Sequence, residues 1–245
     1  MRAIRAVRAL GPIDAKGVVR DPLLRWLVAY PILLALLLRW GVPALTIRLA
    51  DRYGFDLSDY YVLLMSFVVE LMPILAGMVV GFLLLDQKDD GTLAALRVTP
   101  LTLGGYLAYR IAMPMLVSVP MTLAVFPIAG LVRVGVGPLL LMALGAAPLA
   151  PLFALLLATF AGNKVEGFAL TKASGVVLFP PVVAYFVPEP WQWAFGIIPT
   201  YWPVKASWVW WDGGWTSAAL LATGVLYQAL LLRLLLRRFR RVMDR

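Results

Sequence analysis

Six apolar runs, each roughly twenty residues long, decide what this chain can fold into. In a helix that rises about 1.5 Å per residue, such a run crosses the ~30 Å hydrocarbon core of a bilayer. The chain has 245 residues, of which 62% are hydrophobic and 14% charged, whereas a soluble domain carries ~25% charged residues. A large soluble helical core is the alternative, but a chain of this length exposes too much surface to hide so much apolar area. We predict an all-α membrane protein with transmembrane helices at about residues 23–42, 60–85, 106–132, 138–161, 168–187 and 216–236.

Basic residues are divided unequally between the two sides of the predicted membrane. If the N-terminus is cytoplasmic, 17 of the 22 Lys and Arg residues lie on the cytoplasmic side. The five on the outer side are Arg39, Arg48, Arg52, Arg133 and Lys205. Because basic residues accumulate in cytoplasmic loops, this division predicts that both termini are cytoplasmic. It also explains the net charge of +9 without nucleic-acid binding.

The first residues, MRAIRAVRAL, favour a helix that lies on the membrane instead of crossing it. At about 100° per residue, Arg2, Arg5 and Arg8 share one face and apolar residues share the other. Such amphipathic helices lie at the level of the headgroups. We predict an amphipathic interfacial helix within residues 1–20, with a frayed basic tail as the alternative.

Tryptophan is concentrated in the outer segment at residues 188–215, which contains seven of the nine Trp residues. Indole rings favour the membrane–water interface. We predict that Trp191, Trp193 and Trp202 anchor this segment there, as the three arginines do at the other face. An aromatic binding surface for a drug or lipid is the alternative.

The residue types needed for common catalytic sites are missing. The chain has no Cys and no His, which excludes thiolate metal sites and nucleophilic triads that use either residue. Gly162 and Gly167 have the spacing of a phosphate-binding loop, but Phe168 and Ala169 occupy the positions of its Lys and Ser/Thr. The acidic residues 86, 89 and 90 lack the spacing of a calcium loop and favour a solvated helix start. We predict no catalytic residue, metal site or bound cofactor in this chain.

Glu70 is the one ionisable residue expected deep in the membrane. It lies ten residues after Tyr60, roughly 15 Å along a helix. A charge at that depth is costly, so we expect Glu70 to face a cavity or to be protonated. A functional role and a structural hydrogen bond both remain open. Pro73, one turn further, frees a backbone carbonyl and can kink the helix, as can the prolines of spans three to five.

The polar segment at residues 86–105 interrupts the apolar runs in a distinctive way. Three Asp residues between Asp86 and Asp90 are placed to start a helix, where anions favour the dipole. Residues 92–98 then predict a short helix that presents Leu93 and Leu96 and ends at Thr99-Pro100. Such a helix has little to pack on except headgroups or a soluble partner.

This segment carries a resemblance to a known family. Residues 83–110, LLLDQKDDGTLAALRVTPLTLGGYLAYR, resemble the second span, coupling helix and third span of ABC transporter type-2 permeases. The turn FAGNKVEGFALTKASG (residues 160–175) and the outer stretch IIPTYWPVKASW (residues 197–208) are similar too. Six spans with both termini cytoplasmic match this family over nearly the whole chain, and the closest likeness is to permeases of the fluoroquinolone-export kind.

The resemblance implies a single permease domain at residues 1–245, in the bacterial inner membrane, that exports drugs or other amphiphilic molecules or lipids. Residues 1–20 would form the connecting helix, residues 86–105 the coupling loop, and residues 188–215 short outer helices. Glu70 and Pro73 would line the substrate pathway.

The resemblance also implies partners that supply the missing chemistry. ATP and Mg would be bound by a separate ATP-binding subunit, present in two copies, and a second permease copy or a paralogous permease would complete the exporter. Membrane lipids would be further partners, and nucleic acid would not. The residues expected to dock on the ATP-binding subunit are Asp86, Asp90, Gly91, Thr92, Leu93, Leu96, Arg97, Thr99 and Pro100.

Two rival functions remain. A proton- or ion-coupled secondary transporter would use Glu70, although only one deep acid is present and no inverted repeat stands out. A non-transporting membrane scaffold protein would need neither Glu70 nor an ATPase.

Overall fold

The computed structural model describes residues 2–90, 103–212 and 214–243. Within these ranges the protein is all-helical, and six helical segments are long and apolar enough to cross a membrane, which confirms the six predicted spans. These segments are Pro22–Tyr53, Leu57–Asp89, Gly104–Ala129, Val136–Phe160, Lys164–Tyr185 and Trp215–Phe239.

Three spans each contain one long α-helix and three are interrupted. The uninterrupted helices are α4 (Tyr61–Asp89, preceded by the 3₁₀ turn η2, Leu57–Tyr60), α6 (Leu103–Ala129) and α12 (Gly214–Met243). The first span comprises α2 (Pro22–Leu36), the π-helical turn η1 (Leu37–Gly41) and α3 (Val42–Tyr53). The fourth comprises α7 (Val136–Ala146) and α8 (Leu149–Phe160), and the fifth comprises α9 (Lys164–Ser174), η4 (Gly175–Leu178) and α10 (Phe179–Tyr185). Outside the spans lie α1 (Arg2–Arg20), η5 (Trp191–Ile197), α11 (Tyr201–Trp208) and η6 (Val209–Asp212).

The prolines act differently from span to span. The fourth span breaks at Pro148, and the fifth resumes as α10 with two prolines near its start. Both α4, which contains Pro73, and α6, which contains three prolines, remain single helices. Proline is tolerated in membrane helices where neighbouring helices and local adjustments satisfy the freed carbonyls.

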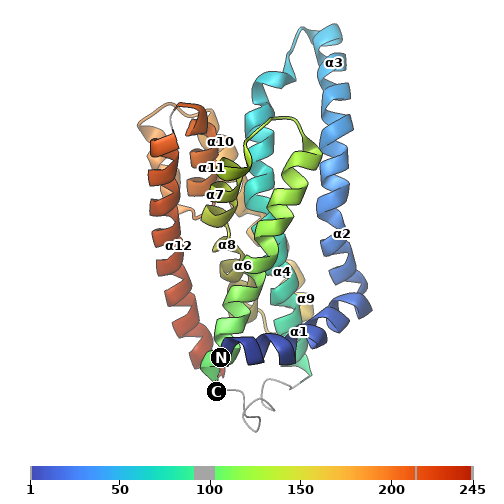
Figure 1. The fold of residues 1–245 in the computed structure, drawn as a ribbon, viewed down its shortest axis with the longest axis vertical. Coiled ribbons are helices and arrows are strands. Elements are labelled where there is room, and N and C mark those ends of the chain that lie inside the picture. The colour runs from blue at the N-terminus through green and yellow to red at the C-terminus, as the bar shows by residue number, and fades with distance from the viewer. Residues whose placement is uncertain (1, 91–102, 213, 244–245) are drawn as a thin grey trace.

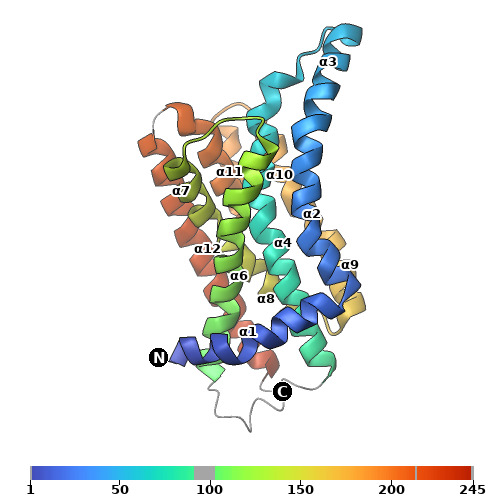
Figure 2. The same cartoon turned by 45° about the vertical axis from the view of Figure 1, so that its right-hand side comes forward.

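The helices form a bundle around α4, with both chain ends at the same end of the molecule (Figure 1). We call this the terminal end. Helix α1 lies across the terminal end, crosswise to the long helices, while α3 projects beyond its neighbours at the opposite end (Figure 2). The most apolar window of the α4 span is 89% buried and that of the α7–α8 span is 78% buried, against 17–28% for the other four. The core of the fold is therefore the contact between α4 and α8.

This contact depends on small residues that face each other. A Cβ atom added to Gly77 of α4 would lie 2.2 Å from the carbonyl oxygen of Ala150 in α8. One turn further, a Cβ atom on Gly81 would lie 3.3 Å from the Cα of Ala154. Small residues four apart allow close backbone approach in membrane helix pairs, and here they occur on both partners.

Two helix boundaries differ from the sequence prediction. The first span, expected to end at residue 42, is helical as far as Tyr53, because polar residues are compatible with a helix once it has left the hydrocarbon. That helix ends at Gly54, whose φ of +63° is left-handed and whose N–H donates to the carbonyl of Ala50. The last span, expected to end at residue 236, continues to Met243, since its Leu- and Arg-rich tail is a strong helix former.

Replacing Gly77 by Ala tests the α4–α8 contact. A helical Gly→Ala change ordinarily stabilises, because Ala restricts the unfolded chain. At Gly77 the added methyl group meets backbone, so we expect destabilisation by about 1–3 kcal/mol. Gly137→Ala is the matched control, since a Cβ atom there meets nothing within 4 Å. Thermal unfolding in detergent measures both, and equal stability of the two variants would contradict the proposed role of the contact.

Candidate functional site

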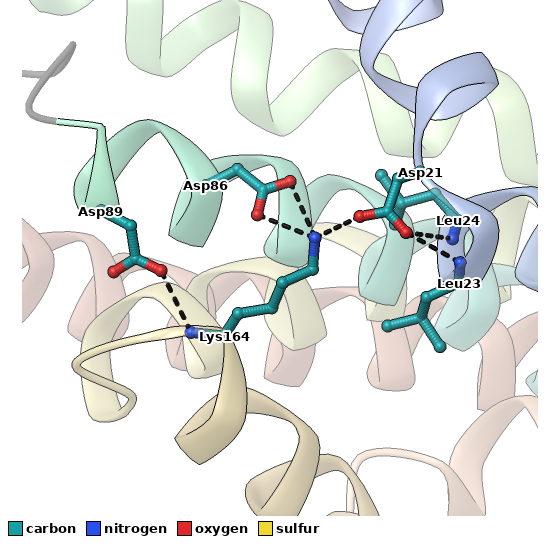
Figure 3. A network of polar contacts seen from close by, with 6 residues as sticks. All are labelled: Asp21, Leu23, Leu24, Asp86, Asp89 and Lys164. Atoms are coloured by element: carbon teal, nitrogen blue, oxygen red, sulfur yellow. Dashed lines mark hydrogen bonds and ion pairs between the residues drawn. The ribbon is translucent and has the colours of Figure 1, made fainter.

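Three helix ends meet at the terminal end around the Lys164 side chain. The Nζ atom of Lys164 lies 2.9 Å from Oδ1 and 3.1 Å from Oδ2 of Asp86, and it also pairs with Asp21. The backbone N–H of Lys164 donates to Asp89 at 3.3 Å. Asp86 and Asp89 belong to the end of α4, Asp21 precedes α2, and Lys164 begins α9, as Figure 3 shows. We call Asp21, Asp86, Asp89 and Lys164 the junction.

Local capping interactions fix two of these helix ends. Asp21 is the N-cap of α2 and accepts hydrogen bonds from the amides of Leu23 at 2.7 Å and Leu24 at 3.3 Å. Asn163 is the N-cap of α9 and accepts a hydrogen bond from the amide of Glu166 at 2.9 Å. Both caps follow the ordinary preference for Asp and Asn at this position. The caps orient the carboxylate of Asp21 and the start of α9 towards each other.

Asp86, Asp89 and Asp90 end helix α4, whereas the sequence prediction had these residues start a helix. Asp86 and Asp89 lie in the last turn of α4, and Asp90 is its C-cap. Acidic side chains at a helix C-terminus oppose the helix dipole. Two lysines offset this cost, since Lys164 pairs with Asp86 and Lys88 places a positive charge in the same last turn of α4. The apolar run alone could not show that α4 continues through these charges.

The junction perturbs the ionisation of Asp21. Partial burial raises the pKa of this carboxyl. The hydrogen bonds from Lys164 and from the Leu24 and Leu23 amides together lower the pKa by more than burial raises it, so it lies below its ordinary value of 3.8. A carboxylate whose folded pKa is depressed stabilises the protein at all pH values above 3.8.

An open hollow adjoins the junction. It has a volume of about 1370 Å³ and lies between the second half of α1 and the end of α4, lined by residues within 13–22 and 83–90. Asp86 and Asp90, two of the predicted docking residues, line it. The other predicted docking residues, from Gly91 to Pro100, lie outside the part of the chain that the structure describes.

A buried ion pair fixes α1 beside the hollow. Arg110 of α6 donates to Asp14 of α1 through both terminal nitrogens, at 2.8 and 3.2 Å, and Tyr109 donates to the same carboxylate at 2.7 Å. The guanidinium also lies over the rings of Tyr106 and Tyr109, with 5.2 and 5.4 Å to their centroids. Asp14 and Arg110 are 8% and 1% exposed. Sequence reasoning missed this pair, although Asp14 is the only acidic residue among the first twenty.

Glu70 lies far from the junction, in the middle of α4. Its side chain is buried, and its Oε2 atom has no hydrogen-bond partner among the described residues. Pro73 is buried one turn further along α4. A small cavity begins one turn on the other side of Glu70, where Met65 and Ser66 line it. The Glu70 side chain is therefore enclosed by protein, and its depth in the membrane stays a prediction.

The outer aromatic segment contains both exposed and packed tryptophans. Trp191 and Trp193 are exposed. Trp202 is half-buried, and its Nε1 donates to the carbonyl of Gly196 at 2.9 Å. A Cβ atom added to Gly224 of α12 would lie 2.5 Å from the Cβ of Trp202, so Trp202 packs directly against α12. The side chains of Arg2, Arg5 and Arg8, the anchors predicted for the other face, lie outside the described part of α1.

A buried lysine, Lys205, organises this outer segment. Sequence reasoning placed it on the outer side but did not identify its partners. The Nζ atom of Lys205 donates to Glu189 at 2.6 Å and to the Gln192 side chain at 2.5 Å. Trp208, on the same helix as Lys205, donates from Nε1 to the hydroxyl of Ser66 in α4 at 3.3 Å. The Lys205 contacts tie α11 to the preceding part of the outer segment, and the Trp208–Ser66 bond ties α11 to α4.

Asp21→Asn tests the junction, because Asn retains the N-cap interaction and removes the charge. We expect a loss of about 1 kcal/mol at neutral pH, since the Lys164–Asp21 pair is only partly buried. The difference in stability between the variant and the wild-type protein should persist down to pH 3.8. It should shrink below that pH, as Asp21 of the wild-type protein becomes protonated in the folded state as well as in the unfolded state. Thermal unfolding across this pH range, with the exposed Asp51→Asn as control, measures it. A difference that does not depend on pH would contradict the charge pairing.

Comparison with known proteins covers nearly the whole chain. Residues 14–236 match the family described as "Fluoroquinolones export permease protein Rv2686c-like". The chain is 38% identical over 249 residues to the fluoroquinolones export permease proteins Rv2686c and MT2760 of two Mycobacterium tuberculosis strains, H37Rv and CDC 1551, covering 98% of each protein. No solved structure shows significant similarity to it.

The family match and the six spans agree on the broad class of the molecule. The spans make it a multi-pass membrane protein, and the relatives carry the name of permeases that export fluoroquinolones. This chain belongs to the family of Rv2686c-like fluoroquinolone export permeases.

Proposed function

We propose that this chain is the membrane-spanning subunit of an ATP-driven ABC exporter in the bacterial cytoplasmic membrane. It moves drugs or other amphiphilic small molecules or lipids out of the cell, while a separate subunit hydrolyses ATP. The observation that carries the proposal is the similarity to named export permeases over 98% of the chain. The basic residues orient the terminal end towards the cytoplasm.

The energy source is assigned to a partner because this chain lacks the groups that bind nucleotide. The Lys and Ser/Thr of a phosphate loop are replaced by Phe168 and Ala169. Two ATP-binding subunits would supply ATP and Mg, and closure of that pair would shift the permease between inward- and outward-facing packings. In this arrangement the permease contributes a surface that moves and contributes no catalytic residue.

The docking surface is assigned to residues 86–100 and the neighbouring junction. Asp86 and Asp90 lie where α4 ends, at the beginning of that segment. A force on the segment would reach α4 directly, and the pairing of Lys164 with Asp86 and Asp21 would pass it to α9 and α2. One contact could therefore displace the ends of three spans together.

The substrate pathway is assigned to the boundary between two permease subunits, either identical or paralogous. Within one chain, α4 packs against α6 and α8, and among the described residues Glu70 is only 1% exposed, so its side chain does not face an open pathway. If the helices separate during transport, Glu70 would present a carboxylate near the midplane. A carboxylate there favours substrates that carry a cationic group.

The docking assignment is tested by changing Leu93 and Leu96 to Asp. The permease is co-expressed with an ABC ATP-binding subunit and assayed for complex formation and for ATP-dependent uptake of a fluoroquinolone into inside-out vesicles. We expect the double variant to insert in the membrane but to lose the complex and the uptake, because two charges replace an apolar contact. Val136→Asp, at a 78% exposed position at the start of α7 and away from the junction, is the control.

The same vesicles separate the rival functions. An exporter of the proposed kind keeps its ATP-dependent uptake in the presence of a protonophore. Uptake that needs no ATP and disappears with the protonophore would establish a secondary transporter. Absence of uptake with every ATP-binding subunit that forms a complex would favour a scaffold protein. Wild-type coupling in the Leu93/Leu96 variant would refute the docking site alone.

Glu70→Gln tests the proposed substrate preference. Loss of the carboxylate should lower transport of a cationic amphiphile at least tenfold, the equivalent of about 1.4 kcal/mol, and leave a neutral analogue unaffected. Glu166→Gln, a change at the start of α9, controls for loss of an acid elsewhere. An equal loss for both substrates would show that Glu70 supports the fold, and an unchanged preference would remove it from the pathway.

A further inference from the structure

A second hollow, of about 670 Å³, opens at the end of the bundle opposite the termini. It lies between the first span and the end of α6, and its lining includes Arg39, Trp40, Pro43, Tyr61 and Gly130. None of the seven residues that line it is acidic. The hollow is separate from the junction, and nothing in the proposed transport cycle uses it.

The position of Arg39 is set by an irregular turn and by one hydrogen bond. Arg39 lies in η1, the π-helical turn that interrupts the first span, and such turns are frequent at functional sites. Its Nη1 donates to the carbonyl of Ile128 at 3.1 Å, which ties the guanidinium to the far side of the hollow. A guanidinium has five N–H donors, so one bond to a neutral carbonyl leaves most of its donors and its charge for another group.

The depth of the hollow identifies which group is available. Arg39 follows Pro22, at the terminal end, by seventeen residues, or roughly 26 Å of helix. The hydrocarbon core is ~30 Å thick, so Arg39 lies near its opposite boundary. Trp40 is 65% exposed beside it, as expected of indole at a membrane interface. Lipid phosphates are the anions concentrated at this level.

We infer that this hollow binds the phosphodiester headgroup of a membrane lipid, with Arg39 as its ligand. The planar fork of Arg pairs with two phosphate oxygens at once. Trp40 and Pro43 offer apolar surface to the glycerol and upper acyl region of the same lipid. The alternatives are a free anion, an interface with a second copy of the chain, and an arginine that only caps the carboxyl end of α6.

The test uses the full chain, purified and delipidated in detergent, and titrates short-chain phosphatidylglycerol while native mass spectrometry counts the bound lipid. Arg39→Gln should raise the Kd about tenfold, the loss expected for charge-assisted hydrogen bonds. Arg39→Lys should have a smaller effect, because it keeps the charge and loses the fork. Arg48→Gln, an exposed arginine of α3 outside the hollow, should leave binding unchanged. Dioctanoylglycerol, which lacks the phosphate, should not bind.

Four results would overturn the inference. If Arg39→Gln and the wild-type chain bind the lipid with equal affinity, Arg39 is not a lipid ligand and only caps the carboxyl end of α6. Equal binding of dioctanoylglycerol would show that the phosphate is not recognised. Displacement of the lipid by millimolar inorganic phosphate would identify a free-anion site. A change of oligomeric state in Arg39→Gln, with lipid binding unchanged, would assign the hollow to contact between copies.

Discussion

The close approach of α4 and α8 is the contact on which the other elements depend. Because Gly77 and Gly81 carry no side chain, the backbone of α4 lies directly against Ala150 and Ala154. No hydrophobic effect draws helices together inside a bilayer, so dispersion contacts at short range must do so. The remaining spans are far less covered and take their places around this pair. The central position of Glu70 is a consequence of the same contact.

Polar interactions fix the helix ends, α1 and the outer aromatic segment, mainly near the two ends of the bundle. At the terminal end Lys164 joins three helix ends, and Arg110 joins α1 to α6. At the opposite end Lys205 holds the aromatic segment. Each cation is at least partly withdrawn from water and is paired with a carboxylate, as the cost of an unpaired buried charge requires. The helices are thus held together mainly by apolar packing in the middle of the bundle and by ion pairs near its two ends.

The sequence predicted what depends on local composition. Run length located all six spans. Counting from Tyr60 placed Glu70 within the second span, and the structure shows that its side chain is buried there. It did not predict pairings between distant residues, since Lys164 and Asp21 are 143 positions apart and Arg110 and Asp14 are 96 apart. It also misplaced helix ends, because hydropathy reports where a helix leaves lipid and not where hydrogen bonding stops. Asp86 and Asp89 look like a helix start for this reason.

The junction has a consequence for the order in which the protein is made. Asp21 and Asp86 leave the ribosome long before Lys164, which begins the fifth span. Until that span is inserted, both carboxylates lack their shared cation, and the acidic end of α4 has no lysine from α9 to oppose its dipole. The ends of α2, α4 and α9 can therefore be joined only after residue 164 has been made.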